Sequence, residues 1–123
     1  FDILDEMSGL DMTDSILNLN KVVLVVCYDI EKTNINGHRS INNFLSYSID
    51  NSIPVYGLSS SSKDELNSKL SNIHLKYPYF LVDQTTLKTI VRSNPGVIIL
   101  DKGVVVDKFH WRNAPSQLSN NQD

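Results

Sequence analysis

Cysteine is nearly absent from this chain, because its 123 residues include a single one, Cys27. One cysteine excludes an internal disulfide framework, a CxxC motif and a cysteine-rich zinc site. Dithiol exchange within the chain is therefore chemically impossible. Cys27 itself lies inside an apolar run, where a free thiol behaves as a small, inert hydrophobe with a raised pKa, so we expect it to be structural.

The chain also lacks basic runs and long apolar stretches. Its net charge of -3 argues against a nucleic-acid partner, since phosphate binding needs clustered Lys and Arg. The longest apolar run, VVLVVCY, is strand-sized and far shorter than a bilayer span of roughly 20 residues. Because the chain begins with Phe1, we expect a piece of a longer protein, attached to a membrane only through segments outside this sequence. The oligomeric state is open.

Motifs of the common cofactor and hydrolase sites are missing as well. The sequence contains no GxGxxG, P-loop or Ser-His-Asp pattern. His38, His74 and His110 lie in different expected elements without HxxxH or HxH spacing, so we expect separate surface histidines. We therefore expect no metal site and no cofactor.

Apolar patterning, in contrast, is clear and alternates between two periods. Continuous β-branched runs indicate strands, and apolar residues at spacings of three and four indicate helices. The expected strands are 21–30, 53–58 and 79–82 and the two arms of a hairpin around the turn at 101–103; the expected helices are 36–50, 62–73 and 85–93. This order predicts an α/β three-layer sandwich with parallel central strands and a C-terminal antiparallel hairpin.

Local signals refine this outline. Ser62 and Glu65 have the spacing of a capping box, Asp83 is placed to cap the following helix, and Thr13 to cap a short turn. We expect an N-terminal extension at 1–20, a domain at 21–112 and a polar, disordered or truncated helical tail at 113–123. Phe109 to Trp111 either cover the sheet, which we favour, or meet a partner.

The segment NPGVIILDKGVVV, from Asn94 to Val106, resembles the corresponding part of the thioredoxin fold. In that fold a cis-proline opens the strand beside the active site, and a glycine turn leads into an edge strand. The resemblance implies that Pro95 is the cis-proline and Gly103 the turn glycine; without it, a trans proline at a strand start is the ordinary expectation. The extra strand and helix at 79–93 look like the insertion of the TlpA-like and peroxiredoxin-like branch.

A narrower resemblance concerns three segments: GLDMTDSILN, VVCYDIEKTN and NPGVIILDKGVVVDKFHWRNAP. They look like the thioredoxin-like domain at the C-terminal end of DoxX-type membrane proteins of Bacteroidetes. This resemblance implies a domain of the bacterial cell envelope, with a cytoplasmic location as the alternative.

The thioredoxin resemblance also implies where a site would lie. In that family the CxxC opens the helix after the first central strand, and the residue before the cis-proline offers its backbone to a substrate peptide. The matching stretch, 31–37, contains no cysteine; Thr33 is its only hydroxyl, and His38 would have to point back to act as its base. The candidate partner-binding residues are Asn94, Pro95, Lys32, Thr33, Asn34 and Ile35.

We therefore expect a redox-inactive thioredoxin-like domain without catalytic residues, which binds a peptide or protein partner at the proline loop. The alternative is a thiol-disulfide oxidoreductase acting through Cys27 or through cysteines outside this sequence. A third possibility is a structural appendage of a membrane region. Asp29 and Glu31 form either an acid pair or a solvated loop.

Overall fold

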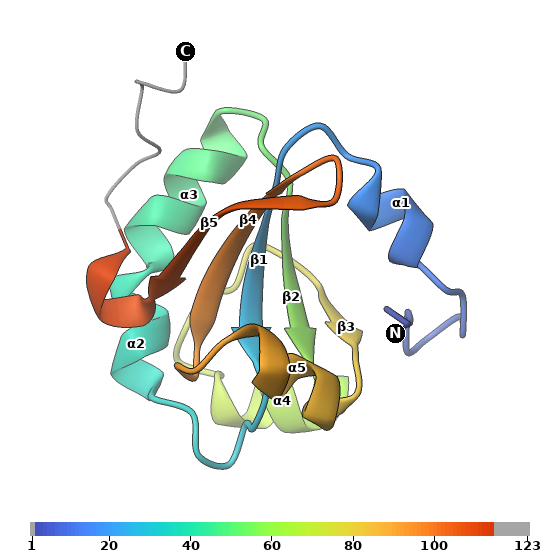
Figure 1. Cartoon of the computed structure of the whole chain (residues 1–123). Helices are drawn as coiled ribbons and strands as arrows, with labels where there is room; N and C mark the ends of the chain where they lie inside the picture. The colour runs from blue at the N-terminus through green and yellow to red at the C-terminus, as the bar shows by residue number, and fades with distance from the viewer. Residues whose placement is uncertain (1, 115–123) are drawn as a thin grey trace.

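The computed structural model describes residues 2–114 and is built around one five-stranded sheet (Figure 1). Its strands, in the spatial order β3-β2-β1-β4-β5, are β1 (Val22–Cys27), β2 (Val55–Ser59), β3 (Tyr79–Leu81), β4 (Gly96–Asp101) and β5 (Val104–His110). β2 is parallel to both β1 and β3, whereas β4 is antiparallel to both β1 and β5. The predicted fold class, a mixed sheet with parallel core strands and a C-terminal hairpin, is confirmed.

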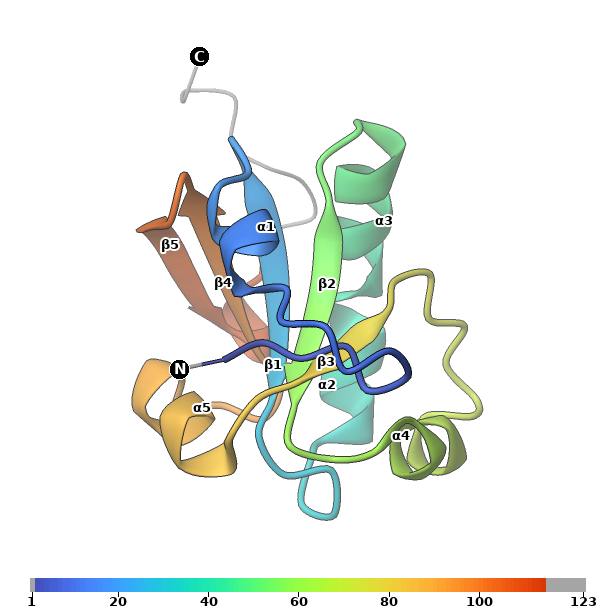
Figure 2. The same cartoon turned by 90° about the vertical axis from the view of Figure 1, so that its right-hand side faces the viewer.

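Helices cover both faces of the sheet, as the two views show (Figures 1 and 2). One face packs against α2 (Ile35–Ser40), α3 (Asn42–Asp50) and α4 (Lys63–Lys69), and the other against α1 (Thr13–Leu17) and α5 (Gln84–Ile90). A short 3₁₀ helix, η1 (Trp111–Asn113), follows β5. Each face therefore has its own apolar cluster, and the sheet lies between them.

β1 is the central strand, and all six of its residues are buried. Its side chains alternate between the two clusters, so that Cys27 faces α2–α4 and Val26 faces α1 and α5. A strand covered on both faces has no polar side, which explains its continuous apolar sequence. The strand is shorter than the predicted 21–30, because the chain leaves the sheet after Cys27 to form the loop that leads to α2.

The third predicted helix, expected at 85–93, ends at Ile90, and the two others differ more from their expected bounds. The helix expected at 36–50 is split into α2 and α3 at Ile41, whose φ of -85° and ψ of -6° interrupt the regular geometry. The helix expected at 62–73 ends at Lys69, yet Leu70 and Ile73 are still buried in the same cluster. In both places the apolar residues keep facing the sheet, so their spacing alone does not reveal where the helix breaks.

The predicted helix caps have mixed outcomes. Ser62 and Glu65 form the capping box at the start of α4, and the Asp83 side chain accepts a hydrogen bond from the first turn of α5. The prediction for Thr13 is wrong, because its Oγ1 accepts a hydrogen bond from the Ile3 backbone N–H at 2.8 Å instead. Thr13 thus fastens the N-terminal segment to α1 rather than capping the helix.

The segment before β1 packs onto the sheet. Ile3 and Ile16 are buried in the cluster on the α5 side, and Leu4 pairs with Leu81 of β3. Of the predicted polar tail at 113–123, positions 115–123 lie outside the described residues. Between residues 2 and 114, no helix is long and apolar enough to cross a membrane.

Candidate functional site

The loop after β1 meets the segment before β4 at the end of the sheet. The Asn34 backbone N–H donates to the Asn94 carbonyl at 2.9 Å, and Asn94 Nδ2 donates to the Asp29 carbonyl at 2.7 Å. The Asn94–Pro95 peptide bond is cis, as the sequence resemblance implied. The two segments on which the predicted site depends, 31–37 and 94–95, therefore lie side by side; we call this contact the loop–proline junction.

Asn34 fixes the start of α2 at this junction. Its backbone is extended, and its Oδ1 accepts a hydrogen bond from the Gly37 backbone N–H at 2.8 Å. Asn34 is thus the N-cap of α2, a role that sequence reasoning did not assign. The signal was available, because Asn is among the preferred N-cap residues.

Aromatic side chains from the end of β5 cover the junction. A Cβ atom placed on Gly37 would lie 2.8 Å from Trp111 Cγ and 3.1 Å from Pro95 Cδ, so the glycine allows this close packing. Phe109 packs edge-on against Phe44 of α3, with ring centroids 5.9 Å apart. Of the two roles considered for 109–111, covering the sheet is the one that the structure shows.

A buried polar pair lies beneath the same loop. Thr33 Oγ1 and His38 Nε2 are 2.9 Å apart, and only 1% of His38 is exposed. The expectation that His38 lies on the surface is wrong, because α2 turns this residue inward toward Thr33; His74 and His110 are exposed as expected. Burial lowers the pKa of His38 from 6.5 to about 4, so the imidazole is neutral at pH 7.

The tautomer of His38 follows from its surroundings. Nδ1 is buried and has no hydrogen-bond partner within the described part of the chain. A proton on Nε2, donated to Thr33 Oγ1, leaves only a lone pair unmatched at Nδ1, whereas the other tautomer would bury an unmatched N–H. The Thr33 hydroxyl is then free to donate to the neighbouring Cys27 sulfur, with which it interacts.

Cys27 is completely buried at the end of β1. Burial raises the pKa of its thiol to about 11, although hydrogen bonds with Thr33 and Ser59 act in the opposite direction. Almost no thiolate therefore exists at neutral pH, and the thiolate is the nucleophilic form. In this structure Cys27 packs as a small core residue.

Replacement of Cys27 by serine is expected to destabilise the domain by about 1–3 kcal/mol. The serine hydroxyl is more polar than the thiol and would be buried at the same position, at a higher desolvation cost. Chemical denaturation of Cys27→Ser beside the parent protein measures this difference. Cys27→Ala is the control, since it removes the sulfur without adding a hydroxyl. A serine variant as stable as the parent would contradict this cost and would show that the neighbouring hydroxyls of Thr33 and Ser59 satisfy the new hydroxyl group.

The other candidate residues at the junction differ in exposure. The Lys32 side chain is exposed, whereas Ile35 is half-buried against the cluster on the α2–α4 side. Asp29 Oδ1 accepts a hydrogen bond from the Glu31 backbone N–H at 3.0 Å, so Asp29 shapes the loop instead of pairing with a second acid. Within residues 2–114 no three His, Cys, Asp or Glu side chains gather in a way that could hold a metal ion.

Several solved protein structures have the same architecture as this chain. A candidate protein disulfide isomerase from Bacteroides thetaiotaomicron superposes with a TM-score of 0.65 at 15% identity, over 92% of this chain and 76% of that one. The pneumococcal exposed lipoprotein thioredoxin from Streptococcus pneumoniae gives 0.61 at 18% identity, over 89% and 87%. A secreted disulfide oxidoreductase from Mycobacterium tuberculosis gives 0.61 at 10% identity, over 99% and 90%.

The chain has a thioredoxin-like fold. No protein-family model matches its sequence, and no curated protein does so either. The likeness is therefore one of structure, and it extends over nearly the whole chain.

Within the thioredoxin-like fold, the start of α2 is the place where the sequence resemblance puts the redox cysteines. Here Asn34 occupies the N-cap, and its own side chain takes a first-turn N–H. The lone thiol, that of Cys27, is buried in β1. Residues 31–37 and 94–95 therefore contain no thiol at this helix start.

Proposed function

We propose that this domain is a redox-inactive thioredoxin-like module that binds a peptide or protein partner at the loop–proline junction. The observation that carries the proposal is the Asn34 cap: the helix start that would stabilise a thiolate is closed by an amide instead. Disulfide exchange through Cys27 gains no support, because its thiol is buried and its pKa is raised. The oxidoreductase alternative therefore depends on cysteines outside this sequence.

The contacts at the junction limit how a partner would bind. The carbonyl of Asn94, which precedes the cis-proline, already accepts a hydrogen bond from the Asn34 N–H. Side chains at this surface would add to any backbone contact of a partner strand, and they include the exposed Lys32 and the half-buried Trp111. Asn94 Oδ1 is a buried acceptor without a partner among the described residues, and a small shift of this side chain would offer it to a donor on the partner.

Binding is tested with an unfolded, cysteine-blocked protein such as carboxymethylated α-lactalbumin as the probe. We expect saturable NMR shift changes confined to residues 31–37, 94–95 and 111, and at least a several-fold loss of affinity in Trp111→Ala because a central aromatic contact is removed. Tyr56→Ala, a half-buried aromatic elsewhere on the sheet, is the control. Shifts that leave the junction untouched would refute the docking surface.

Reductase activity is tested separately. The domain is expected not to accelerate reduction of insulin by dithiothreitol, and Cys27→Ser is expected to behave identically, because the buried thiol takes no part. Activity in the parent protein that disappears in Cys27→Ser would establish the oxidoreductase alternative and contradict the proposal.

We further propose that the domain belongs to a membrane-attached envelope protein of the DoxX type from Bacteroidetes. The three resembling segments support this, as do structural neighbours that include a Bacteroides protein, an exposed lipoprotein and a secreted enzyme. Reporter fusions at the end of the full-length gene product test the location. Signal only from a reporter active outside the cytoplasm agrees with it, whereas signal only from a cytoplasmic reporter overturns it.

A further inference from the structure

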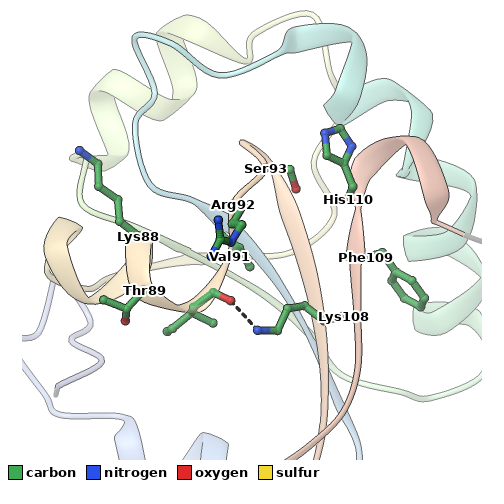
Figure 3. A pocket seen from close by; sticks show the side chains of 9 residues that line it. Lys88, Thr89, Val91, Arg92, Ser93, Lys108, Phe109 and His110 are labelled. Atoms are coloured by element: carbon green, nitrogen blue, oxygen red, sulfur yellow. Dashed lines mark hydrogen bonds between the residues drawn. The ribbon is translucent and has the colours of Figure 1, made fainter.

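A cavity of about 660 Å³ opens between α5 and the end of β5 (Figure 3). Three basic residues line it, Lys88, Arg92 and Lys108, together with His110. None of the nine residues that line it is acidic. The cavity is therefore a concentration of positive charge on a protein whose net charge is -3.

A second cavity of about 420 Å³ extends this basic region. It shares Lys88 and Arg92 with the first cavity and adds Lys32, while Asp29 is its only acidic residue. Four of the 11 Lys and Arg residues of the chain thus line two adjoining cavities. Like charges held together repel one another, and the repulsion is relieved when an anion occupies the space between them.

The basic groups of the first cavity come from different elements. Lys108 extends from β5 to the Ile90 carbonyl, to which its Nζ donates at 2.8 Å, so its ammonium is held at the cavity while its other N–H bonds stay available (Figure 3). Arg92 approaches from the segment after α5, and the next residue, the buried Ser93, also lines the cavity. The Lys88 ammonium lies 5.9 Å from the centre of the Tyr28 ring, toward the second cavity.

We propose that the first cavity binds the phosphate group of a phosphate monoester. The guanidinium of Arg92, the ammonium of Lys108 and the hydroxyl of Ser93 belong to residues that line one cavity, and a tetrahedral dianion with three acceptor oxygens offers an acceptor to each of them. A planar carboxylate has fewer acceptor directions and half the charge. The apolar side chain of Val91 also lines the cavity and suits the organic part of the ester, whereas the Phe109 ring packs on the other face of the sheet against Phe44. The three basic residues are not part of the loop–proline junction, so the two sites can be tested independently.

The proposal is tested by NMR titration of the domain with glycerol phosphate. We expect saturable shifts at Arg92, Ser93 and Lys108, with a dissociation constant of about 1 mM or below. Arg92→Gln and Lys108→Gln are each expected to weaken binding about tenfold or more, because a charge-assisted hydrogen bond is lost. Arg39→Gln, at an exposed arginine of α2, is the matched control and leaves the affinity unchanged.

Two further probes distinguish the source and chemistry of the anion. Vesicles of phosphatidylcholine with and without phosphatidic acid test whether the anion is a lipid headgroup. Arg92-dependent binding to both glycerol phosphate and phosphatidic acid would identify a lipid as the source of the phosphate. Arg92-dependent binding to glycerol phosphate alone would identify a soluble ester. Succinate tests a dicarboxylate. The proposal is overturned by binding to vesicles alone, by succinate binding as tightly as glycerol phosphate, by no binding at all, or by affinity that Arg92→Gln leaves unchanged.

Discussion

Phe44→Ala is expected to lower the free energy of unfolding by about 3–5 kcal/mol, the cost of removing a buried phenyl ring and leaving a cavity. Only 1% of Phe44 is exposed, and its ring packs edge-on against Phe109 of β5. The substitution removes the contact that fastens the end of β5 to α3, so Trp111 should also loosen its packing on Gly37. Chemical denaturation gives the energy, and Trp111 fluorescence reports the local change.

Phe44→Leu is the control for this substitution. It keeps most of the apolar volume, so we expect a loss below about 1.5 kcal/mol and an unchanged Trp111 spectrum. Equal losses in the alanine and leucine variants would show that the ring does not fill a closely packed site. A loss below about 1 kcal/mol in Phe44→Ala would contradict its place in the core.

The stability of the domain is expected to fall by about 3 kcal/mol through His38 between pH 6.5 and pH 4. The unfolded chain protonates this imidazole near its ordinary pKa of 6.5, whereas burial keeps it neutral in the folded protein down to about pH 4. Its depressed pKa means that the full stability is present above pH 6.5 and is lost as the pH falls toward 4. Denaturation midpoints measured across this range give the effect.

Comparison with a non-titrating variant isolates the histidine from the carboxylates that titrate at the same pH. In His38→Gln the amide can still reach Thr33, and the pH dependence of stability is expected to be shallower by the same amount. His74→Gln, a substitution at an exposed histidine, is the matched control. Parallel curves for the parent protein and His38→Gln would show that His38 is not buried in neutral form.

The central part of the fold could be predicted because its signals are local and repeated. The apolar run of β1 is buried on both faces, and the capping box at Ser62 and the cap at Asp83 both form as predicted. These features depend on residues close in sequence, whose preferences agree with the final structure. The class of fold could therefore be inferred without knowledge of any tertiary contact.

The site was harder to predict because its contacts join segments far apart in sequence. The Asn34–Asn94 hydrogen bond joins residues that are 60 positions apart, and no local sequence pattern around either residue predicts it. A single histidine has no periodicity, so the burial of His38 depends on how α2 rotates toward Thr33. Thr13 shows the same limit, because the hydroxyl that was expected to cap a helix accepts a hydrogen bond from the backbone N–H of Ile3 instead.

The exposed valines of β5 show a further limit of sequence patterns. Val104, Val105 and Val106 indicate a strand correctly, yet 52–63% of each is exposed because β5 is the outer strand of the sheet. The register of β5 against β4 also shifts between Ile99 and Leu100. Such an irregularity twists an edge strand and hinders its pairing with another chain. Strand order, which patterns do not encode, decides this exposure.

This thioredoxin-like domain is expected to have no reactive thiol, and the rate of Cys27 alkylation by iodoacetamide in the native protein measures this. We expect labelling that is slow at pH 7, rises only as the pH approaches the thiol pKa of about 11, and becomes fast at pH 8.5 when denaturant is added. Fast native labelling with a pKa below about 8.5, the value for a free thiol, would contradict it.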